Sequence, residues 1–569
     1  MPVEIRDLRA LEGPNLYYGQ PAVKLLTWSD RDIRREIGDG IKTWAQATGV
    51  VIGYLQQQLE QADDGLLILT TFTTPFPSVG KRIVEGVVAD LQAAEQGDED
   101  YSHDDVVFDV MGLRKREEPP IGLLQIFAEA RARDLPFIPR EDGTVMVGSG
   151  ASGHVFDPAG LSLGLSIEIP WDSVGRVPVL AITGTNGKTT TVRLCAHILQ
   201  AAGKRVGRTD TDGITIAGEL VESGDWAGFA GARRVLSDPR VDVAVLETSR
   251  GGILRRGLGF DLCDVSVITN VSSDHLGELG VDTLEEMAQA KGVIALVTRG
   301  TGRVVLNADD PRVAALEEFI GAPIVWFTRN PRRLELLDHL AEGGDAVWSD
   351  GDSIHVAFDG TRQSFSLRDV PIVVGGAAIH NVENVMAATA ACVALGVEVG
   401  AVAAALQTFL TGPVNNPGRL NLFRAGGVTA ILDYAHNEAA LAALLDFSRK
   451  LQFEGGGRLI VVLGGPGNRP DAQVVAQGRL VGAVADEVVV YEQERYLRGR
   501  APGEMPALYR RGILAERPSE ERVVLAPDEI HAVQHALSVA KPGDVVVVVA
   551  HARLDELLGV LETWQHAEA

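Results

Sequence analysis

One glycine-rich turn, placed between an apolar strand and a helix-length segment, constrains this chain more than any other feature. The apolar run Val179–Thr183 leads directly into Gly184–Thr189, which reads GTNGKT. Glycines let a backbone turn tightly so that its N–H groups face phosphate oxygens, and the following helix adds positive potential. Lys188 would then reach the β- and γ-phosphates of ATP, and the Thr189 hydroxyl would ligate Mg²⁺. Because Ile182 stands where the longer form of this loop has glycine, a chance glycine-rich turn is the alternative at this point.

Beyond residue 178 the chain alternates between short β-branched runs and helix-length periodic segments. Such alternation produces βαβ units and a mostly parallel sheet. We expect strands at Val179–Thr183, Val243–Glu247, Val265–Asn270, Val304–Asn307 and Ile324–Phe327, and helices at Lys188–Ala202, Leu284–Thr298 and Val382–Leu395. A stretch at 346–374 is more β-like and interrupts the alternation.

A second block of the same kind begins near residue 413, after a segment with prolines and a glycine, 413–418, that we interpret as a hinge. We expect strands at 430–432, 459–463, 487–490, 523–525 and 545–549, and helices around 438–450, 471–484, 528–540 and 553–563. The predicted fold class is therefore α/β and multidomain. It comprises a P-loop central domain with a mostly parallel sheet at 173–412, a Rossmann-like domain at 413–569 and an α+β N-terminal domain at 1–172.

The N-terminal domain is less regular in pattern. Alternation predicts a strand at Ala22–Trp28, and helical patterns lie around 30–62 and 78–91. The acidic segment 92–104 lacks large aliphatic side chains and is expected to be an exposed loop. The small-residue run 148–153 is a candidate linker.

Composition narrows the class of protein. With 569 residues the chain is too long for one hydrophobic core and fits three or four domains of ~150 residues. Its net charge of −25 disfavours a general attraction to nucleic acid or to an anionic membrane surface. Cys195, Cys263 and Cys392 lie far apart among apolar neighbours, which predicts buried thiols in a reducing compartment rather than a zinc site. No signal-peptide pattern and no run of ~18 uncharged apolar residues occurs, so we expect a cytoplasmic protein.

Polar residues follow two of the predicted strands downstream of the phosphate loop. Glu247 ends a strand, Asp274 and His275 follow another, and Lys291 lies in the next helix. A carboxylate at the carboxyl end of a strand in an α/β sheet points into the ligand crevice. One such residue alone is usually an ordinary surface or core residue. Four of them behind a phosphate loop are better explained as one site.

The order of motifs from residue 184 onward resembles that of the Mur ligase family, whose members form amide bonds and convert ATP to ADP. The shared motifs are GTNGKTTT at 184–191, Glu247, Asp274-His275, Ala290-Lys291, LNADD at 306–310, HNVEN at 380–384, PGR at 417–419 and DYAHN at 433–437. Within that family the chain is similar to the cyanophycin synthetase branch, notably at 246–277, 282–294, 464–474 and 496–504.

The N-terminal domain resembles the same branch at residues 8–23. Residues 130–153 resemble only the first elements of an ATP-grasp ligase module, and the Mur-like block begins near residue 178. That interval is too short for an ATP-grasp domain. The resemblance therefore implies an N-terminal domain with an ATP-grasp remnant, in a chain that does not polymerise an aspartate backbone by itself.

The resemblance also implies a role for each matching residue. Catalysis is assigned to Lys188, Glu247, His275, Lys291 and Arg419. ATP binding is assigned to Gly184, Thr185, Asn186, Gly187, Lys188, Thr189, Thr190, Asn384, Arg419, Asp433 and His436. Binding of Mg²⁺ is assigned to Thr189, Thr211, Glu247 and His275.

Three of these assignments have alternatives. Lys291 matches a lysine that many family members carbamylate, but it fits equally a surface lysine in an i,i+4 ion pair. Asn384 would contact adenine, against the alternative of a polar amide near a helix N-terminus. Arg419 would contact phosphate with its fork of donors, although a Pro-Gly-Arg turn is often merely exposed.

The substrate-side residues are less defined. Arg250, Arg255 and Arg256 suit an anionic acceptor, although arginines on a helix face are most often solvated. The turn at 468–471 and the stretch at 498–504 resemble parts of the cyanophycin synthetases that would bind the incoming amino acid. Because asparagine at 468 replaces an acidic residue of that pattern, the identity of the amine is undetermined.

The sequence thus predicts an ADP-forming carboxylate–amine ligase that acts through an acyl phosphate on an amino-acid-like or peptidic acceptor. Its predicted partners are small-molecule amino acid or peptide substrates, without nucleic acid or membrane, and a homo-oligomer stays open. A scaffold that binds ATP for another ligase is the main alternative, and a kinase that stops at phosphate transfer is the other. The complete set Lys188, Glu247, His275 and Lys291 favours the ligase.

Overall fold

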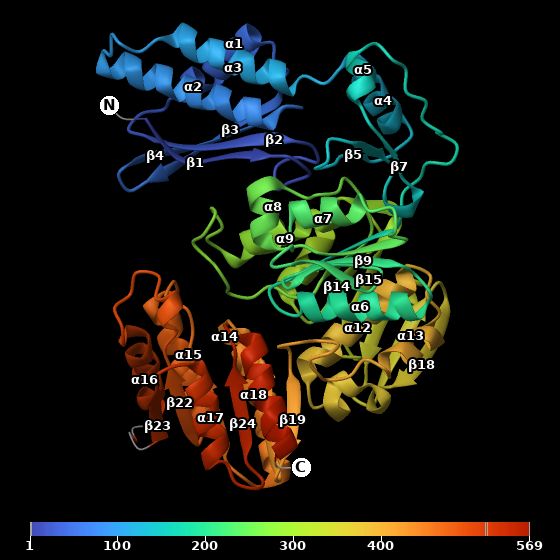
Figure 1. Cartoon of the computed structure of the whole chain (residues 1–569), viewed down its shortest axis with the longest axis vertical. Coiled ribbons are helices and arrows are strands. Elements are labelled where there is room, and N and C mark those ends of the chain that lie inside the picture. The colour runs from blue at the N-terminus through green and yellow to red at the C-terminus, as the bar shows by residue number, and fades with distance from the viewer. Residues whose placement is uncertain (1–2, 518, 520–521, 568–569) are drawn as a thin grey trace.

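The computed structural model describes residues 3–517, 519 and 522–567. The three larger of the four sheets are arranged along the long axis of the molecule, with the N-terminal part at one end, the C-terminal part at the other and the largest sheet between them (Figure 1). Their strands lie at 4–73, 179–366 and 421–549. These ranges fall on either side of the domain limits expected at 172 and 412, which stay predictions as limits.

The central part is built on an eleven-stranded sheet whose middle is parallel, in the order β11-β10-β9-β12-β8-β13-β14-β15-β16-β17-β18. The parallel strands are β9 (Val206–Asp210), β12 (Val243–Glu247), β8 (Val179–Thr183), β13 (Cys263–Ile268), β14 (Thr298–Asn307), β15 (Ile324–Thr328) and β16 (Asp345–Ser349). The antiparallel edges are β10 (Gly213–Ile216), β11 (Glu219–Ser223), β17 (Ser353–Phe358) and β18 (Thr361–Ser366). The mixed α/β class with a large, mostly parallel sheet is confirmed.

Helices cover both faces of this sheet. One face carries α6 (Lys188–Ala201), α12 (Ile379–Ala394) and α13 (Val399–Leu406), and the other carries α7 (Phe229–Leu236), α8 (Arg250–Arg256), α9 (Leu284–Leu296), α10 (Pro311–Ala314) and α11 (Leu334–Ala341). Strands β8 and β12 are buried at every residue, because a parallel sheet covered on both faces needs apolar side chains on both. The carboxyl ends of its parallel strands therefore meet at one edge, where α/β folds bind ligands.

The C-terminal part is a smaller doubly wound sheet in the order β19-β20-β24-β21-β22-β23. Its strands are β19 (Asn421–Ala425), β20 (Val428–Asp433), β24 (Val545–Val549), β21 (Leu459–Leu463), β22 (Glu487–Tyr491) and β23 (Val523–Ala526). Its helices are α14 (Glu438–Gly455), α15 (Asp471–Val484), α16 (Glu504–Glu516), α17 (Glu529–Val539) and α18 (Leu554–Ala567). All strand pairs except β19–β20 are parallel, so this separate sheet also opens its carboxyl edge toward a ligand.

The N-terminal part is an antiparallel sheet with helices on one side. Its strands are β1 (Glu4–Leu11), β2 (Ala22–Ser29), β4 (Gly65–Thr73) and β3 (Gly53–Ala62), and its helices are α1 (Arg34–Thr48), α2 (Pro77–Gln96) and α3 (His103–Glu117). A short connecting unit follows, with α4 (Ile121–Ala132), β5 (Phe137–Pro139), β6 (Val145–Val147), β7 (His154–Phe156) and α5 (Ala159–Ser162). It leads the chain down to the central sheet (Figure 1).

The helix expected over 30–62 is wrong in its second half. The helix ends at Thr48, where Gly49 takes the left-handed conformation with a φ of 68°. Glycine adopts that conformation without steric cost and commonly ends helices. Residues 53–62 instead form β3 and pair with β4, because the polar side chains of this glutamine-rich run suit a partly solvated edge strand.

Two predicted loops are also corrected. The segment 92–104 is helical as far as Gln96, where α2 ends before Gly97 with a φ of 65°, and it is helical again from His103, where α3 begins. Only 97–102 form the loop. The candidate linker at 148–153 is a packed turn: Ser149 Oγ accepts a hydrogen bond from the Val177 amide at 3.0 Å. A Cβ added at Gly150 would lie 2.5 Å from the Val241 carbonyl oxygen, so small residues here serve close packing rather than flexibility.

The remaining expectations for the central and C-terminal strands are confirmed with shifts of a few residues. All three cysteines are buried and unpaired, as expected. Among the residues that the structure describes, no helix combines the length and the apolar character that crossing a bilayer requires.

Candidate active site

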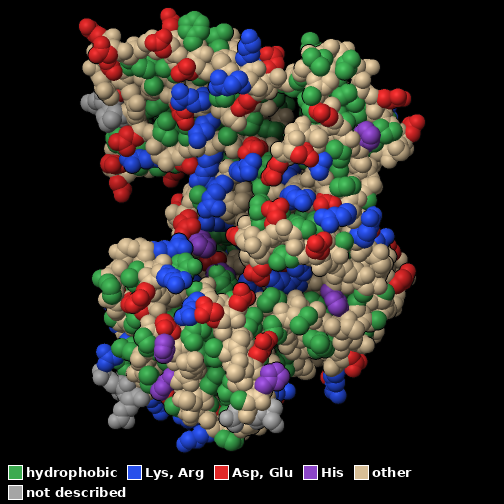
Figure 2. Space-filling model, viewed as in Figure 1, with side chains coloured by type: hydrophobic (Ala, Val, Ile, Leu, Met, Phe, Trp, Pro, Cys, Tyr) green, Lys and Arg blue, Asp and Glu red, His purple; other side chains and the backbone are tan. Residues whose placement is uncertain are grey.

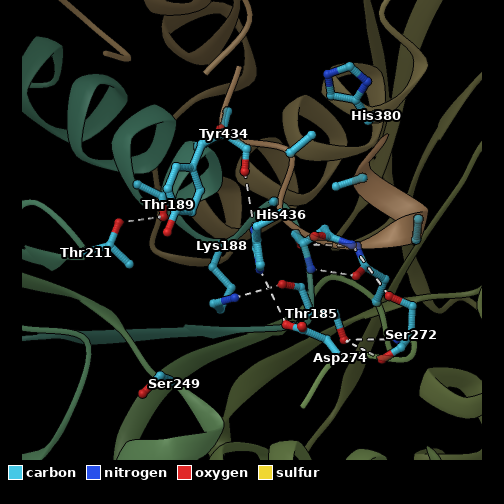
Figure 3. A pocket seen from close by; sticks show the side chains of 18 of the residues that line it. Thr185, Lys188, Thr189, Thr211, Ser249, Ser272, Asp274, His380, Tyr434 and His436 are labelled. Atoms are coloured by element: carbon cyan, nitrogen blue, oxygen red, sulfur yellow. Dashed lines mark hydrogen bonds and ion pairs between the residues drawn. The ribbon is translucent and has the colours of Figure 1, made fainter. Parts of the chain in front are cut away.

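A cavity of about 650 Å³ lies at the carboxyl ends of the central strands and is lined by residues of both the central and the C-terminal parts (Figure 3). Its volume falls in the usual range for small-molecule sites. Every residue that the sequence assigned to catalysis, nucleotide or metal lines it: Gly184, Thr185, Asn186, Gly187, Lys188, Thr189, Thr190, Thr211, Glu247, His275, Lys291, Asn384, Arg419, Asp433 and His436. The fold thus brings together residues that lie up to 252 positions apart.

The phosphate loop is held tightly from beneath by the loop after β13. The Thr185 amide donates to the Asn270 carbonyl at 2.8 Å, and the Asn186 amide donates to the Asn270 side chain at 2.9 Å. Gly187 has a φ of 83°, and a Cβ added there would lie 2.3 Å from Asn384 Oδ1. Only glycine fits this position, so the backbone can turn into α6 with Lys188 at its first residue.

Oxygen atoms gather where the loop meets the end of β12. Thr189 Oγ1 donates to Glu247 Oε2 at 2.9 Å and lies 3.4 Å from Thr211 Oγ1. The other Glu247 oxygen, Oε1, is buried without a hydrogen-bond partner among the described residues. Burial raises the pKa of Glu247 from 4.5 to about 7, against the opposing charge of Lys188. A buried carboxylate oxygen without a partner, beside two hydroxyls, fits a hard divalent cation such as Mg²⁺.

The described residues contain no group of three or more His, Cys, Asp or Glu side chains arranged to hold a metal. This agrees with the usual Mg²⁺ site, in which one or two carboxylates act together with water and substrate phosphates. The fourth predicted ligand, His275, lies in the loop after β13 with a φ of 54°. Its Nδ1 lies 3.1 Å from Glu278 Oε1, and half of its side chain is exposed. Its role as a metal ligand stays a prediction.

Lys291 is buried beneath the phosphate loop. Its Nζ donates to the Gly184 carbonyl at 2.9 Å, and only 4 % of the residue is exposed. Burial, and then the charge of Lys188, lower the pKa of Lys291 well below its usual value. The surface ion pair considered above is therefore wrong, because a buried side chain cannot make it.

The nucleoside side of the cavity is formed by α12 and by the end of β20. Asn384 Nδ2 donates to Asn381 Oδ1 at 3.1 Å, so its amide is partly used within α12. Asp433 ends β20 and accepts a hydrogen bond from the Leu420 amide at 2.8 Å; burial raises its pKa to about 6. The Arg419 guanidinium stacks 4.4 Å above the Tyr434 ring, which directs it into the cavity.

Two contacts close the C-terminal part over the phosphate loop. Asn437 Nδ2 donates to Asn186 Oδ1 at 2.9 Å, and Asn186 Nδ2 donates back to Asn437 Oδ1 at 3.2 Å. His436 Nε2 lies 3.4 Å from Asp274 Oδ2, and Figure 3 shows this pair beside Lys188. Although burial opposes it, the hydrogen bond from His436 lowers the pKa of Asp274 to about 2. The structure is therefore in a closed arrangement.

Sequence reasoning missed a buried network behind this site. Arg193 of α6 is 2 % exposed, and its guanidinium donates to Asp210 at 3.3 Å and to Asn416 at 3.0 Å. Asn416 in turn donates to Thr190 Oγ1 at 3.2 Å. The network ties the phosphate-loop helix to the linker that carries Arg419. The only available signal was an arginine between the apolar residues Val192 and Leu194 of a predicted helix, which does not identify its partners.

The three candidate acceptor arginines of α8 differ in their contacts. Arg256 makes a two-point ion pair with Glu12, at 2.6 and 2.9 Å. Arg250 donates to the carbonyl oxygens of His275 and Glu278 at 3.0 and 2.9 Å. Arg255 lines the cavity and is exposed, and it makes no hydrogen bond or ion pair with another described residue. Arg255 is therefore the one of the three that is available to an anion.

The other substrate-side residues lie away from this cavity. Arg500 donates to Asp471 at 2.8 Å and to the carbonyl oxygens of Gly467 and Arg469 at 2.8 and 2.6 Å. Arg500 therefore holds the stretch at 498–504 against the turn at 468–471. No residue of either segment lines the cavity in the described structure. Their proposed contact with an incoming amino acid stays a prediction.

Two family models match the chain. The family described as Domain of unknown function (DUF4938) matches residues 2–325, and the Mur ligase, glutamate ligase domain matches residues 418–551. The first match runs through residues 153–178, where the sequence suggested a missing ATP-grasp module. One family model therefore matches the N-terminal part together with the central part as far as residue 325.

Known proteins similar to the chain include ligases of two kinds. A cyanophycin synthetase of Crocosphaera subtropica is 39% identical over 420 residues, which cover 72% of this chain and 47% of that protein. A UDP-N-acetylmuramoyl-L-alanyl-D-glutamate–2,6-diaminopimelate ligase of Geobacillus thermodenitrificans is 28% identical over 391 residues, which cover 66% of this chain and 73% of that protein. The chain thus spans about half the length of the cyanophycin synthetases that it matches.

Among solved structures, E. coli FolC in complex with DHPP and ADP aligns with a TM-score of 0.50 at 19% sequence identity. The alignment covers 69% of this chain and 89% of that chain. At this identity the likeness concerns the fold alone.

Proposed function

The chain belongs to the family described as Domain of unknown function (DUF4938) and to the Mur ligase family, and from this premise we propose that it is an ATP-dependent ligase that forms amide bonds. Its substrates would be a carboxylate and an amine, with ADP and phosphate as the other products. One observation carries the proposal: Lys188, Thr189 and Glu247 share a cavity with Arg419 and Asp433, which come from a different part of the chain. Closure of two parts over a nucleotide aligns the reacting groups and excludes water.

In the proposed first step, an oxygen of the substrate carboxylate attacks the γ-phosphorus of ATP, the bond to the β–γ bridging oxygen breaks, and ADP leaves. The nitrogen of the amine then attacks the carbonyl carbon of the acyl phosphate, phosphate leaves, and the nitrogen gives up a proton. Because negative charge moves across the phosphoryl group, catalysis depends on fixed cations. Lys188 and Arg419 would supply them from opposite sides of the cavity.

Glu247, Thr189 and Thr211 would hold Mg²⁺ together with phosphate oxygens, since their atoms already lie in contact and one Glu247 oxygen lacks a partner. When bound, the ion supplies neutralisation of phosphate charge. On the nucleoside side, Asp433 would accept hydrogen bonds from the ribose hydroxyls. Asn384 and His436 would lie beside the base and the phosphates.

Arg255 is proposed to hold the anionic acceptor. A charge-assisted hydrogen bond contributes ~1.5 kcal/mol, so Arg255→Ala is expected to raise the KM for the carboxylate roughly tenfold and to leave the KM for ATP unchanged. Steady-state kinetics at saturating ATP measure the effect. Arg362→Ala, at an exposed position of the distant strand β18, is the matched control. Equal KM values in both variants would contradict this role.

Lys291 is proposed to react with CO₂. Burial, and then the charge of Lys188, lower the pKa of Lys291 well below its usual value, which favours the neutral, nucleophilic form of the amine. We expect a carbamate signal in ¹³C NMR with labelled bicarbonate, and its loss in Lys291→Arg. Lys42→Arg, at an exposed lysine, should keep the signal. A wild-type spectrum without any signal that depends on Lys291 would contradict carbamylation.

The proposed function is tested by supplying ATP, Mg²⁺ and a panel of carboxylates with hydroxylamine, and by measuring ADP and hydroxamate. A ligase gives both products with at least one carboxylate. ATP binding without either product would favour the scaffold, and ADP with a stable phosphorylated product would favour a kinase. The measured ADP must disappear in Lys188→Ala, because ADP that a contaminating ATPase forms would not depend on Lys188.

The choice of substrates is not taken from the relatives. The relatives carry two different names, cyanophycin synthetase and UDP-N-acetylmuramoyl-L-alanyl-D-glutamate–2,6-diaminopimelate ligase, and the chain spans about half the length of the former. We infer an amino-acid-like or peptidic acceptor, and we do not extend polymer formation to this chain. A cytoplasmic location and a homo-oligomeric state stay predictions.

A further inference from the structure

Helix α8 forms a wall of the cavity but is too short to be stable alone. It has seven residues, and isolated helices of that length are unstable in water. Its N-terminus faces the cavity: Ser249 caps it by accepting a hydrogen bond from the Gly252 amide at 3.1 Å, and Ser249, Arg250 and Gly251 line the cavity. At the other end, the last carbonyl groups of a helix have no partners within the helix. Whatever satisfies them determines whether α8 holds its place.

The N-terminal part supplies donors for two of those carbonyl groups. Arg9 Nη1 donates to the Leu254 oxygen at 2.9 Å, and the Glu12 amide donates to the Arg256 oxygen at 2.7 Å. In the reverse direction, the Leu258 amide donates to the Pro14 oxygen at 2.7 Å. These residues, 9–14, are called the clamp below. They add to the local cap of the helix, in which the Gly257 amide donates to the Ile253 oxygen at 2.9 Å.

Glycines on both sides allow the two backbones to approach. A Cβ added at Gly13 would lie 1.9 Å from the Leu258 oxygen, and one added at Gly257 would lie 2.6 Å from the Gly13 oxygen. Gly257 also has a φ of 82°, which disfavours other residues. The Glu12–Arg256 ion pair lies at the rim of this contact, with both side chains more than a third exposed. It therefore orients the two segments relative to each other but contributes little to the free energy of folding.

From α8 the contacts continue to a second wall of the cavity. Arg250 holds the 275–278 loop by donating to the carbonyl oxygens of His275 and Glu278. His275 and Leu279 have φ values of 54° and 61°, an unfavourable conformation that persists only when the surroundings hold it. The Lys24 ammonium of β2 lies close to Gly280, just beyond this loop, since a Cβ added at Gly280 would lie 3.3 Å from it.

We propose that the N-terminal part, through the clamp, is a structural component of the active site that positions α8 and the 275–278 loop for binding of the acceptor. Figure 1 shows the N-terminal sheet lying over α8, and Figure 2 shows Lys and Arg side chains gathered on this face where the two parts meet. Glu12, Gly13 and Arg9 are positioning residues, because they act through α8 and touch no reacting group. The consequence for acceptor binding rests on the proposed ligase function.

The test uses the full chain and two variants of the clamp. Gly13→Val places a branched side chain against the Leu258 carbonyl. Arg9→Met removes the donor to the Leu254 oxygen without adding a branched side chain. Gly19→Ala is the matched control, since nothing lies within 4 Å of a Cβ at that position. In hydrogen exchange followed by mass spectrometry, peptides covering 249–258 and 273–281 are expected to exchange roughly tenfold faster in both clamp variants. Peptides of α6 and α14 should exchange as in the wild type.

The kinetic arm uses the carboxylate that yields most hydroxamate with the wild type. Both clamp variants are expected to raise the KM for that carboxylate roughly tenfold and to leave the KM for ATP within about twofold. Unchanged exchange at 249–258, or equal acceleration across the whole chain, would overturn the clamp. If no carboxylate gives hydroxamate with the wild type, the proposed ligase function is contradicted. The exchange data still decide whether the N-terminal part holds α8. If Gly13→Val does not fold, Arg9→Met alone decides.

Discussion

Replacing Lys188 with alanine is expected to abolish measurable turnover, a loss of at least roughly 10²–10³-fold, because one preorganised donor in a phosphoryl-transfer site contributes that much. The Lys188 ammonium donates to the Thr185 carbonyl at 2.9 Å, within the loop that would hold phosphate. Alanine removes both the donor and the positive charge opposite Arg419. Release of ADP at saturating ATP, Mg²⁺ and carboxylate measures the loss.

The same substitution is expected to leave the fold intact. The hydrogen bond to Thr185 runs within the loop, and its removal should change the free energy of unfolding by only ~1 kcal/mol. Lys204→Ala, at an exposed lysine after α6, is the matched control and should retain full turnover. Normal turnover in Lys188→Ala would mean that the catalytic site lies elsewhere in the chain.

The parts of the site that could be predicted are those set by local pattern. β-branched runs such as Val243–Glu247 indicate buried parallel strands, and ligand-binding residues follow from the rule that such strands end at one edge. The phosphate loop needs the same local information, because its glycines and its lysine are adjacent in sequence. The resemblance to Mur ligases added Asn384, Arg419 and Asp433, which no periodicity indicates.

The parts that could not be predicted depend on pairing between distant residues. Nothing in the sequence around Glu12 indicates that its backbone caps a helix at 250–256, because any segment with free N–H groups can do so. The two hydrogen bonds between Asn186 and Asn437 could not be predicted from the sequence either, since asparagines are usually surface or turn residues. The strand at 53–62 was missed because its polar pattern fits a solvated helix and an edge strand equally well.

These distant contacts join three parts of the chain around one cavity. The clamp fixes α8 from the N-terminal side, and the Asn186–Asn437 and Asp274–His436 contacts hold the C-terminal part over the loop. Arg193 connects α6 with Asn416 in the linker. Opening the C-terminal part would break the second group together with contacts such as that of Lys450 with the Ala377 carbonyl. It would leave the clamp intact, because the clamp joins only the N-terminal part and α8. Nucleotide exchange would therefore leave the acceptor wall in place.

Glu247→Gln is expected to have the second large effect, with opposite signs for activity and for stability. Loss of the charged ligand should weaken Mg²⁺ binding and lower turnover by roughly 10²–10³-fold, since metal stabilisation of phosphate charge contributes several kcal/mol. Glutamine keeps the size of the side chain and one oxygen near Thr189. Turnover titrated with Mg²⁺ measures the effect. Glu219→Gln, at an exposed carboxylate of β11, should behave as wild type.

The stability effect follows from the pKa of Glu247, which burial raises from 4.5 to about 7. The native state therefore binds this proton more tightly than the unfolded state, and wild-type stability falls as pH rises from 4.5 to 7. That interval corresponds to about 3 kcal/mol at 1.36 kcal/mol per pH unit. Glutamine cannot ionise, so the variant should be more stable than wild type by about this amount at pH 8, and the advantage should vanish below pH 4.5. Hydrogen exchange of the β12 amides, corrected for the intrinsic rate at each pH, measures opening of the central sheet alone. A difference that is independent of pH would show that the Glu247 carboxylate is already solvated or paired, and would remove the reason for placing the cation beside its unpartnered oxygen.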